Sequence, residues 1–574
     1  MRKVVIAIAL ILLARAHAGP GLPAVSVRVE PGHAPSLVVD GAALAPYMFA
    51  ANNQYGRDEV LQAEIAQAEA AGFPIYTINL PAPLPKDPQA VVEAVQKFTT
   101  AHPRAYLLAR AWLGADDAWR AAHPEDLLRD DTGATIGYVS PASEAWRAEV
   151  GQRLGDALKA IGRSECAPCF LGVMLTYLNT GEWFYPETDR YWDYSPPSKA
   201  AFRRWLTQRY KEDAALRAAW GDAAVTLATA EIPTLVQREA VAWGPFRASA
   251  AGRDYARFTA NLMAETIAHF AAIAKAASDR RMLVGTFYGY TFELNHNGPR
   301  ALQHSGHLAL ARVLANPDID FVAAPYSYLE RGMGEPGHFH FPVESIALHR
   351  KLAMIEDDTF TDRSILPPGA TEPGNNARAK TPEETVQLAR RNFGNAVAHG
   401  AGLWWFDIYS EGRWGAESFW KSTAVLREVA DSVSRARVEP PAVAVIVDEE
   451  AIAALRDTGN PALEQALGFA RAEFDRLGTP IGYYLQSDLD QISPTTRVLY
   501  FATPFDLSVE FRAEIAKRIA DGATVVFGWM LQQGGTAAFA PERIERLAGF
   551  GASLAPADTP RRIIDADGDA LDIP

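Results

Sequence analysis

Short apolar runs alternate with longer helical stretches along the chain from residue 43 to residue 408. Apolar runs of this length, followed by polar or aromatic residues, are typical of buried parallel strands, and the stretches between them fit crossover helices. Eight runs are predicted to be strands: Leu44–Asn52, Pro74–Leu80, Ala105–Trp112, Phe170–Tyr177, Arg281–Tyr288, Ile319–Tyr326, Lys351–Asp357 and Gly402–Ile408. This alternation predicts an α/β fold, a (β/α)8 TIM barrel, with its site at the carboxyl ends of the strands.

Helical patterns fill the intervals between these runs. The clearest are Glu59–Ala71, Pro88–Ala101, Ser143–Ile161, Thr259–Ala277 and Pro382–Ala398. About a hundred residues separate the fourth run from the fifth, which is more than one crossover helix needs. We therefore expect an insertion at about residues 183–258, with helices at Ser195–Tyr210 and Glu212–Trp220.

A second alternating unit follows a proline-bearing linker signal at Arg437-Val-Glu-Pro-Pro441. Its predicted strands are Val443–Val447, Ile481–Gln486, Arg497–Ala502 and Ala523–Gly528, and its predicted helices are Pro461–Leu477 and Ser508–Ala520. The pattern indicates a small doubly wound, flavodoxin-like α/β domain. Glycine-rich nucleotide motifs are missing from its sequence. The expected division is a barrel over 19–438, an α/β domain over 442–550 and a tail over 551–574.

The N-terminus has the three parts of an export signal. Arg2-Lys3 precedes the apolar run Val4–Leu13, and the small residues of a cleavage site, Ala16-His17-Ala18, follow it. The apolar run is too short for a stable membrane anchor, and no later stretch approaches the ~20 apolar residues of a membrane helix. Residues 1–18 are thus predicted to be a signal peptide, with the mature protein periplasmic or extracellular and without a membrane partner.

Charge and cysteine content exclude several classes of function. The net charge of −14 argues against a nucleic-acid partner, because backbone binding needs clustered basic residues, and it fits a neutral substrate better. Cys166 and Cys169 are the two cysteines of the sequence, too few for a structural zinc site, and either a local disulfide or two thiols fits them. The histidines of Gly337–Phe341 suit a loop or substrate rim better than a metal pair, so we expect no metal or cofactor.

Two glutamates follow predicted strands in positions that suit acid and nucleophile chemistry. Hydrolysis of a glycosidic bond with retention needs two carboxyl groups about 5–5.5 Å apart. Glu182 stands just beyond the fourth strand, beside Trp183 and Phe184, and Glu356 ends the seventh. Desolvation by the neighbouring rings would raise the pKa of Glu182, as a general acid requires. Glu182 is therefore predicted to be the acid/base and Glu356 the nucleophile.

Other residues are predicted to support this pair. Tyr326 and Arg110 are candidate donors that hold Glu356 ionised. Candidates for a sugar platform are Trp404, Trp405 and Trp414, and candidates for hydroxyl contacts are Asn52, Asn53, Asn79 and Tyr288. A strand-end glutamate can also form a structural salt bridge, and Glu187, Glu330 and Glu335 are rival carboxylates.

The positions of the two glutamates after strands four and seven resemble those of the clan A glycoside hydrolases. The stretch from Ser198 through Trp205 and Trp220-Gly221 to Glu231-Ile-Pro233 is similar to family 42 β-galactosidases, and the segment Tyr483–Ser508 is similar to their trimerisation domain. The resemblance implies a retaining β-galactosidase-like glycoside hydrolase, a carbohydrate substrate and a homotrimer.

One position departs from the family pattern. The family places an asparagine immediately before the acid/base glutamate, where its amide contacts the sugar 2-hydroxyl, but here Thr-Gly separates Asn179 from Glu182. Either Asn179 reaches the sugar from a reshaped loop or another residue has this role. A retaining β-glycosidase for another sugar and a catalytically inactive carbohydrate-binding barrel stay open, whereas a thiol amidotransferase is excluded because the second unit has no cysteine.

Overall fold

The computed structural model describes most of the chain between residues 21 and 572. The described ranges are 21–30, 32–52, 58–186, 190–294, 301–365, 378–433, 438–456, 463–528, 531, 533, 538–548, 553, 562–564 and 570–572. The predicted signal peptide, Asn53, Glu187, the linker residue Arg437 and most of the predicted tail lie outside these ranges.

Eight parallel strands close into a barrel, as the alternation of apolar runs predicted. In chain order they are β4 (Tyr47–Ala50), β5 (Ile75–Asn79), β6 (Tyr106–Trp112), β9 (Phe170–Thr176), β12 (Leu283–Phe287), β13 (Phe321–Pro325), β14 (Leu352–Asp357) and β15 (Gly402–Trp405). Barrel strands that follow one another along the chain are also paired in space, and β15 pairs with β4 to close the barrel. All eight predicted runs therefore contain a barrel strand, and the barrel brings their carboxyl ends to one mouth.

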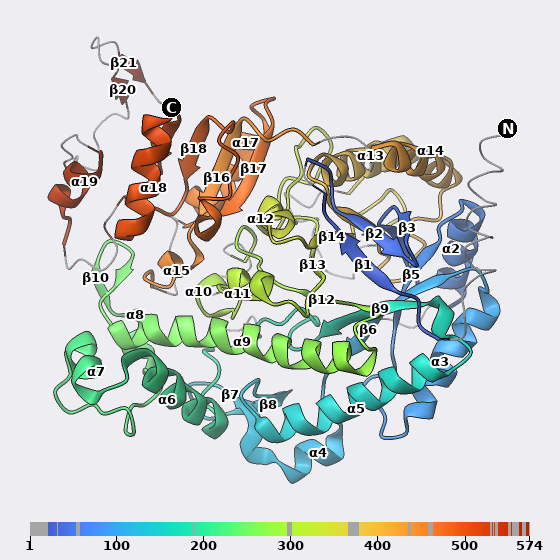
Figure 1. The fold of residues 1–574 in the computed structure, drawn as a ribbon, viewed down its shortest axis with the longest axis horizontal. Coiled ribbons are helices and arrows are strands. Elements are labelled where there is room, and N and C mark those ends of the chain that lie inside the picture. The colour runs from blue at the N-terminus through green and yellow to red at the C-terminus, as the bar shows by residue number, and fades with distance from the viewer. Residues whose placement is uncertain are drawn as a thin grey trace.

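Helices cover the outside of this barrel (Figure 1). They include α2 (Asp58–Ala70), α3 (Pro88–Ala101), α5 (Glu144–Arg163), α9 (Ala250–Ala277), α11 (Leu310–Ala315), α12 (Val343–Leu348), α13 (Pro382–Ala398) and α14 (Glu417–Val433). The bounds of α3 and α13 agree with the prediction because Asp87 and Thr381 cap them and proline follows each cap. Helix α9 begins nine residues before its predicted start, where the side chain of Ser249 accepts from the amide of Gly252.

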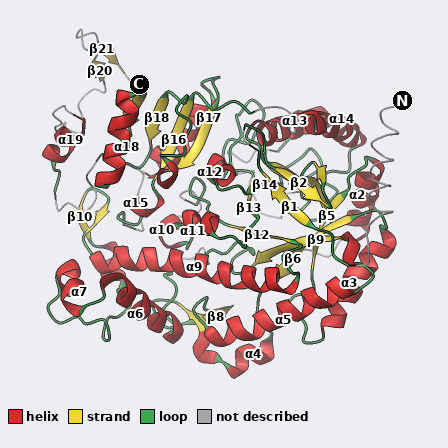
Figure 2. Ribbon diagram, viewed as in Figure 1, coloured by secondary structure: helices red, strands yellow, loops and turns green. Residues whose placement is uncertain are grey.

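The insertion between β9 and β12 has a small core of its own. It contains α6 (Pro196–Tyr210), α7 (Asp213–Trp220), α8 (Leu235–Glu239) and a hairpin of β10 (Val241–Trp243) and β11 (Phe246–Arg247). Phe202 packs against Tyr255 and Phe258 of α9, so the insertion rests on a barrel helix. Figure 2 shows this helical lobe beside the long α9.

Two strand groups were not predicted from the sequence. Ahead of the barrel, β1 (Val25–Arg28), β2 (Ser36–Val39) and β3 (Ala42–Leu44) form an antiparallel sheet. After α4 (Asp117–Ala122), β7 (Leu127–Arg129) and β8 (Thr135–Val139) form a hairpin. These strands are short, and their sequences carry no long apolar run.

The second unit is a parallel sheet with the order β17-β16-β18-β19. Its strands are β16 (Val443–Val447), β17 (Ile481–Leu485), β18 (Val498–Phe501) and β19 (Thr524–Phe527). In chain order this is 2-1-3-4, the arrangement with which a flavodoxin-like sheet begins. The predicted helix Pro461–Leu477 is described from Leu463, and there a π-helical turn, Glu464–Phe469, precedes α17 (Ala470–Asp475).

Buried side chains of the second unit make hydrogen bonds to barrel loops. Arg471 of α17 donates to the carbonyl oxygens of Phe292 and Phe339, at 3.1 and 2.9 Å. Glu449, at the start of α15 (Glu449–Ile452), accepts from the amides of Leu310 and Ala311, at 2.7 and 3.0 Å. The sheet is therefore joined to the barrel by specific polar contacts.

Within the described ranges, no helix combines the length and the apolar character that a membrane crossing requires.

Candidate active site

Glu356 is the penultimate residue of β14 and is buried at the mouth of the barrel. It lies in register with Trp404 on β15, and the indole N–H of Trp404 donates to its Oε2 across 2.8 Å. Arg110 of β6 reaches across the barrel and forms an ion pair with the same oxygen. The guanidinium of Arg110 lies over the rings of Phe287 and Phe406, at 5.3 and 4.9 Å from their centres. A cation and an indole donor thus hold one oxygen of this carboxylate.

Opposing effects act on the pKa of Glu356. Burial raises this pKa above its ordinary value, and the charge of Asp358 adds to the rise. Arg110 and the Trp404 hydrogen bond lower it. Because both donors favour the charged form, they offset part of the desolvation and support the carboxylate that a nucleophile needs.

Glu182 lies on a tight loop directly after β9. The amide of Trp183 donates to the carbonyl of Tyr177 across 2.9 Å, and the amide of Glu182 donates to that of Asn179 across 2.9 Å. Four residues of the loop have positive φ angles: Leu178, Thr180, Gly181 and Trp183. So many left-handed residues persist only where the surrounding contacts determine them, so the loop fixes the direction of the Glu182 side chain.

The carboxyl of Glu182 meets hydroxyl groups rather than a cation. Tyr290 donates to its Oε1 across 2.7 Å, and Thr180 donates to its Oε2. The pKa of Glu182 is raised to about 8, mainly by burial and in smaller part by the negative charges of Glu356 and Asp358, while the two hydroxyl donors oppose the rise. At neutral pH this group holds its proton, as a general acid must.

His307 joins the Glu182 loop to the loop after β12. Its Nδ1 accepts from the amides of Gly289 and Tyr290, at 3.1 and 3.2 Å, so its hydrogen lies on Nε2. That Nε2 donates to the carbonyl oxygen of Glu182 across 2.8 Å. Burial lowers the pKa of His307 to about 3, so the ring is neutral and serves to position the loops.

The three candidate platform tryptophans do not share one location. Trp404 faces into the barrel and contacts Glu356, as described above. Trp405 follows it on the strand and points the opposite way, with Phe73 and Phe419 at 5.5 and 5.7 Å. Trp414 also packs on Phe419, at 4.7 Å. Trp405 and Trp414 are each 1% exposed, so both belong to the core, and the prediction that they form a sugar platform is corrected.

Two predicted tyrosines are also structural. The hydroxyl of Tyr326 accepts from Asn395 of α13 across 2.6 Å, which places it outside the barrel wall and not on Glu356. Trp404 is the donor to Glu356 in the place where Tyr326 was predicted. The hydroxyl of Tyr288 donates to the carbonyl of Gly306 across 2.5 Å, and its ring stacks on His307. Tyr288 therefore supports His307 instead of offering a hydroxyl contact.

The predicted asparagines end strands or lie in loops at the mouth. Asn79 is exposed and in register with Arg110. Asn179 is partly exposed in the Glu182 loop, where its backbone pairs with that of Phe184. Asn52 accepts from Thr77 across 2.6 Å.

The described rival carboxylates are engaged elsewhere. Glu330 forms an ion pair with Arg476 across 2.8 Å, and Glu335 accepts from the amide of Gly332 across 2.6 Å. Among the described residues, no three His, Cys, Asp or Glu side chains are arranged to hold a metal ion.

Sequence reasoning missed Tyr290 and His307. Tyr290 follows the fifth strand by three residues, so the rule that found Tyr288 could have reached it. No local pattern marks His307, because it acts on a loop more than a hundred residues earlier in the chain.

One family model matches part of this chain. The sequence model of glycoside hydrolase family 42, described as beta-galactosidase, matches residues 185–445. A search of curated proteins gives no match.

Solved β-galactosidases are similar in fold. The enzyme from *Marinomonas* ef1 superposes with a TM-score of 0.63 at 14% identity, covering 92% of this chain and 83% of its own. That from *Bacillus circulans* sp. *alkalophilus* gives a TM-score of 0.63 at 17% identity, covering 92% and 80%. That from the haloarchaeon *Halorubrum lacusprofundi* gives 0.60 at 17% identity, covering 84% and 73%.

Proposed function

We propose that this chain, a glycoside hydrolase similar to family 42 β-galactosidases, is a retaining β-glycosidase with Glu356 as nucleophile and Glu182 as acid/base. The observation that carries the assignment is the contrast between two carboxyls at one barrel mouth. Glu356 is held by Arg110 and Trp404, whereas burial raises the pKa of Glu182 to about 8. One carboxyl is thus prepared to attack and the other to donate a proton.

The first half-reaction forms a glycosyl-enzyme. Both donors to Glu356 converge on Oε2, so Oε1 is the oxygen that attacks the anomeric carbon. As the glycosidic bond breaks, Glu182 transfers its proton to the leaving oxygen, and the aglycone departs as a neutral alcohol.

The second half-reaction releases the sugar. Glu182, now a carboxylate, takes a proton from a water molecule as that water attacks the anomeric carbon from the face that the aglycone left. The bond to Glu356 breaks and its carboxylate is restored. Two inversions give a product with the configuration of the substrate.

The substrate class, site of action and assembly belong to the same proposal. The acidic chain and the carboxyls at the mouth favour an uncharged carbohydrate. The signal-like residues 1–18 support a periplasmic or extracellular enzyme. The second parallel sheet, similar in sequence to a trimerisation domain, supports a homotrimer.

A panel of aryl β-glycosides with NMR detection of the first-formed product tests this function. We expect turnover of a β-galactoside or another β-glycoside, and a product that is initially β. A 2-deoxy-2-fluoro glycoside should label the peptide that contains Glu356. An α product would contradict retention, and sugar binding without turnover would favour the inactive carbohydrate-binding barrel.

A further inference from the structure

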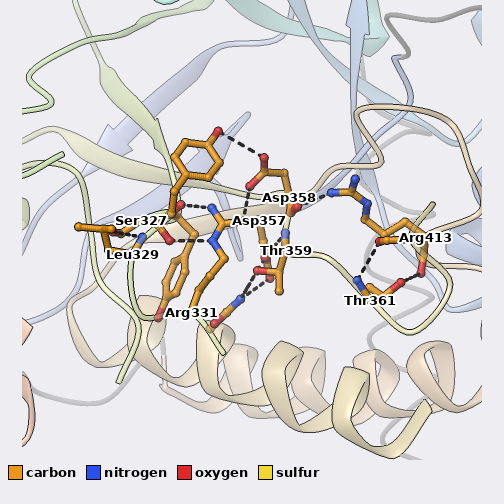
Figure 3. A network of polar contacts seen from close by, with 12 residues as sticks. Ser327, Leu329, Arg331, Asp357, Asp358, Thr359, Thr361 and Arg413 are labelled. Atoms are coloured by element: carbon orange, nitrogen blue, oxygen red, sulfur yellow. Dashed lines mark hydrogen bonds and ion pairs between the residues drawn. The ribbon is translucent and has the colours of Figure 1, made fainter. Parts of the chain in front are cut away.

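A third carboxylate, Asp358, follows the nucleophile on the same strand edge. The side chain of Asp357 points outward, where both its oxygens accept from Asn392 of α13 at 3.0 Å. Because successive side chains of an extended strand point to opposite sides, we expect Glu356 and Asp358, which flank Asp357, to face inward. The charge of Asp358 acts on both Glu182 and Glu356, in agreement with this direction. Figure 3 shows Asp357 and Asp358 side by side.

The carboxylate of Asp358 is held rigidly from behind. Arg331, a fully buried side chain, donates to its Oδ1 across 2.9 Å, and the Nε of Arg331 is fixed by the carbonyl oxygen of Ser327 at 2.7 Å. Arg413 donates to the backbone oxygen of Asp358. These contacts fix the direction of the carboxylate, and Figure 3 shows them converging from two sides.

Tyr328 closes the other side of Asp358 and lies near both catalytic groups. Its hydroxyl donates to Asp358 Oδ2 across 3.3 Å, while its ring lies under the guanidinium of Arg331 at 4.4 Å. Burial raises the pKa of Tyr328 well above its ordinary value, and Asp358, Glu182 and Glu356 all add to the rise. The phenol therefore keeps its proton, and its partly exposed side chain lies among three carboxyls.

This arrangement has hydrogen-bonding capacity that is not used by the residues that the structure describes. A carboxylate accepts about four hydrogen bonds, and the contacts to Asp358 from Arg331 and Tyr328 account for two. The oxygen of Tyr328 can accept a further hydrogen bond as well. One sugar hydroxyl can donate its hydrogen to the Asp358 carboxylate, and its oxygen can accept the phenolic hydrogen of Tyr328 when that hydrogen turns from Asp358 to the sugar.

We propose that Asp358 and Tyr328 bind a hydroxyl of the sugar unit that Glu356 attacks, and that they thereby select which uncharged sugar the enzyme accepts. The inference rests on the proposed glycosidase function. A sugar with a carboxylate or sulfate in place of this hydroxyl would bind poorly, because its negative charge would be repelled by the Asp358 carboxylate.

Monodeoxy substrates test this contact directly. With the best aryl β-glycoside as parent, kcat/KM is measured for analogues that lack the hydroxyl at C3, C4 or C6. In the wild type, one analogue should lose about 10- to 100-fold, the usual range for a hydrogen bond to a charged group. In Asp358→Asn and Tyr328→Phe, the parent should lose activity and the difference between parent and that analogue should shrink.

Tyr328→Phe covers the case in which Asp358→Asn disturbs the Arg331 ion pair and fails to fold. Asp357→Asn is the matched control, because it makes the same chemical change on the outward side of the strand; it should keep the wild-type deoxy pattern even if its Tm falls. If both site variants lose as much kcat/KM on the deoxy analogues as the wild type does, the inference about Asp358 and Tyr328 is wrong. The glycosidase function would not be affected by that result. Absence of wild-type turnover on every glycoside would contradict the glycosidase function as well.

Discussion

Tyr290 donates its phenolic hydrogen to Glu182 Oε1 across 2.7 Å, and its own amide donates to His307 Nδ1. Since His307 Nε2 donates to the Glu182 carbonyl, these residues form a closed loop of hydrogen bonds. Glu182 is therefore held through its side chain and its backbone by Tyr290, which follows the fifth barrel strand, and by His307.

The alkaline limb of the pH profile should report Glu182. A general acid works while protonated, so kcat/KM should fall as pH rises through about 8, the raised pKa of this carboxyl. Tyr290→Phe removes a hydrogen bond that lowers this pKa, and the limb should move to higher pH. Profiles over pH 5–10 check both points, with Tyr138→Phe as a control outside the Glu182 contacts. A limb that stays in place in Tyr290→Phe would show that another group controls it.

Loss of the acid should depend on the leaving group. Glu182→Ala should lose about 10²–10⁴-fold on substrates with alkyl or sugar aglycones, which need a proton to leave. Dinitrophenyl glycosides need none, so they should still form the glycosyl-enzyme, which then accumulates because the base is also gone. Azide should restore turnover and give the β-glycosyl azide. Equal losses on both substrate types without azide rescue would remove the acid/base assignment.

Replacement of the nucleophile should abolish turnover without unfolding the protein. Glu356→Gln keeps the shape of the side chain and one oxygen that can accept from Trp404 or Arg110. We expect kcat to fall by several orders of magnitude, with the far-UV circular dichroism spectrum unchanged. Glu335→Gln, a change in a loop carboxylate, should stay near wild-type activity. Near wild-type turnover by Glu356→Gln would show that a different carboxylate attacks.

Assembly can be measured independently of activity. The resemblance of the second unit to a trimerisation domain leads us to expect a homotrimer. Light scattering of the purified protein at micromolar concentration should give about three times the chain mass. A monomeric mass across the accessible concentration range would exclude this assembly.

The barrel could be predicted because each of its strands is a nearly continuous apolar run, such as β14, which is buried along its whole length. Glu182 and Glu356 were predicted as site residues by the same logic, since one stands shortly after an apolar run and the other lies at the end of one. The orientation of single side chains was harder. Trp404 and Trp405 are adjacent on β15, and the sequence contains no signal for which of the two side chains faces into the barrel.

The parts of the site that were missed depend on contacts between distant segments. His307 and Asp358 acquire their roles from Glu182 and Arg331, which the fold brings to them from other loops. Tyr326 illustrates the converse: it directly follows β13, where a site residue is expected, yet its hydroxyl accepts from Asn395 of a helix that packs outside the barrel. Pattern alone cannot assign such partners.

The hydrogen bonds between the barrel and the side chains of Arg471 and Glu449 affect how the protein unfolds. Separation of the two units would leave the carbonyls of Phe292 and Phe339 and the amides at the start of α11 without these partners, and it would leave a buried guanidinium uncompensated. The α/β unit is therefore not a detachable module. Calorimetry of the intact chain should show one cooperative transition, and a barrel expressed without the residues after 441 should melt at a lower temperature than the whole protein.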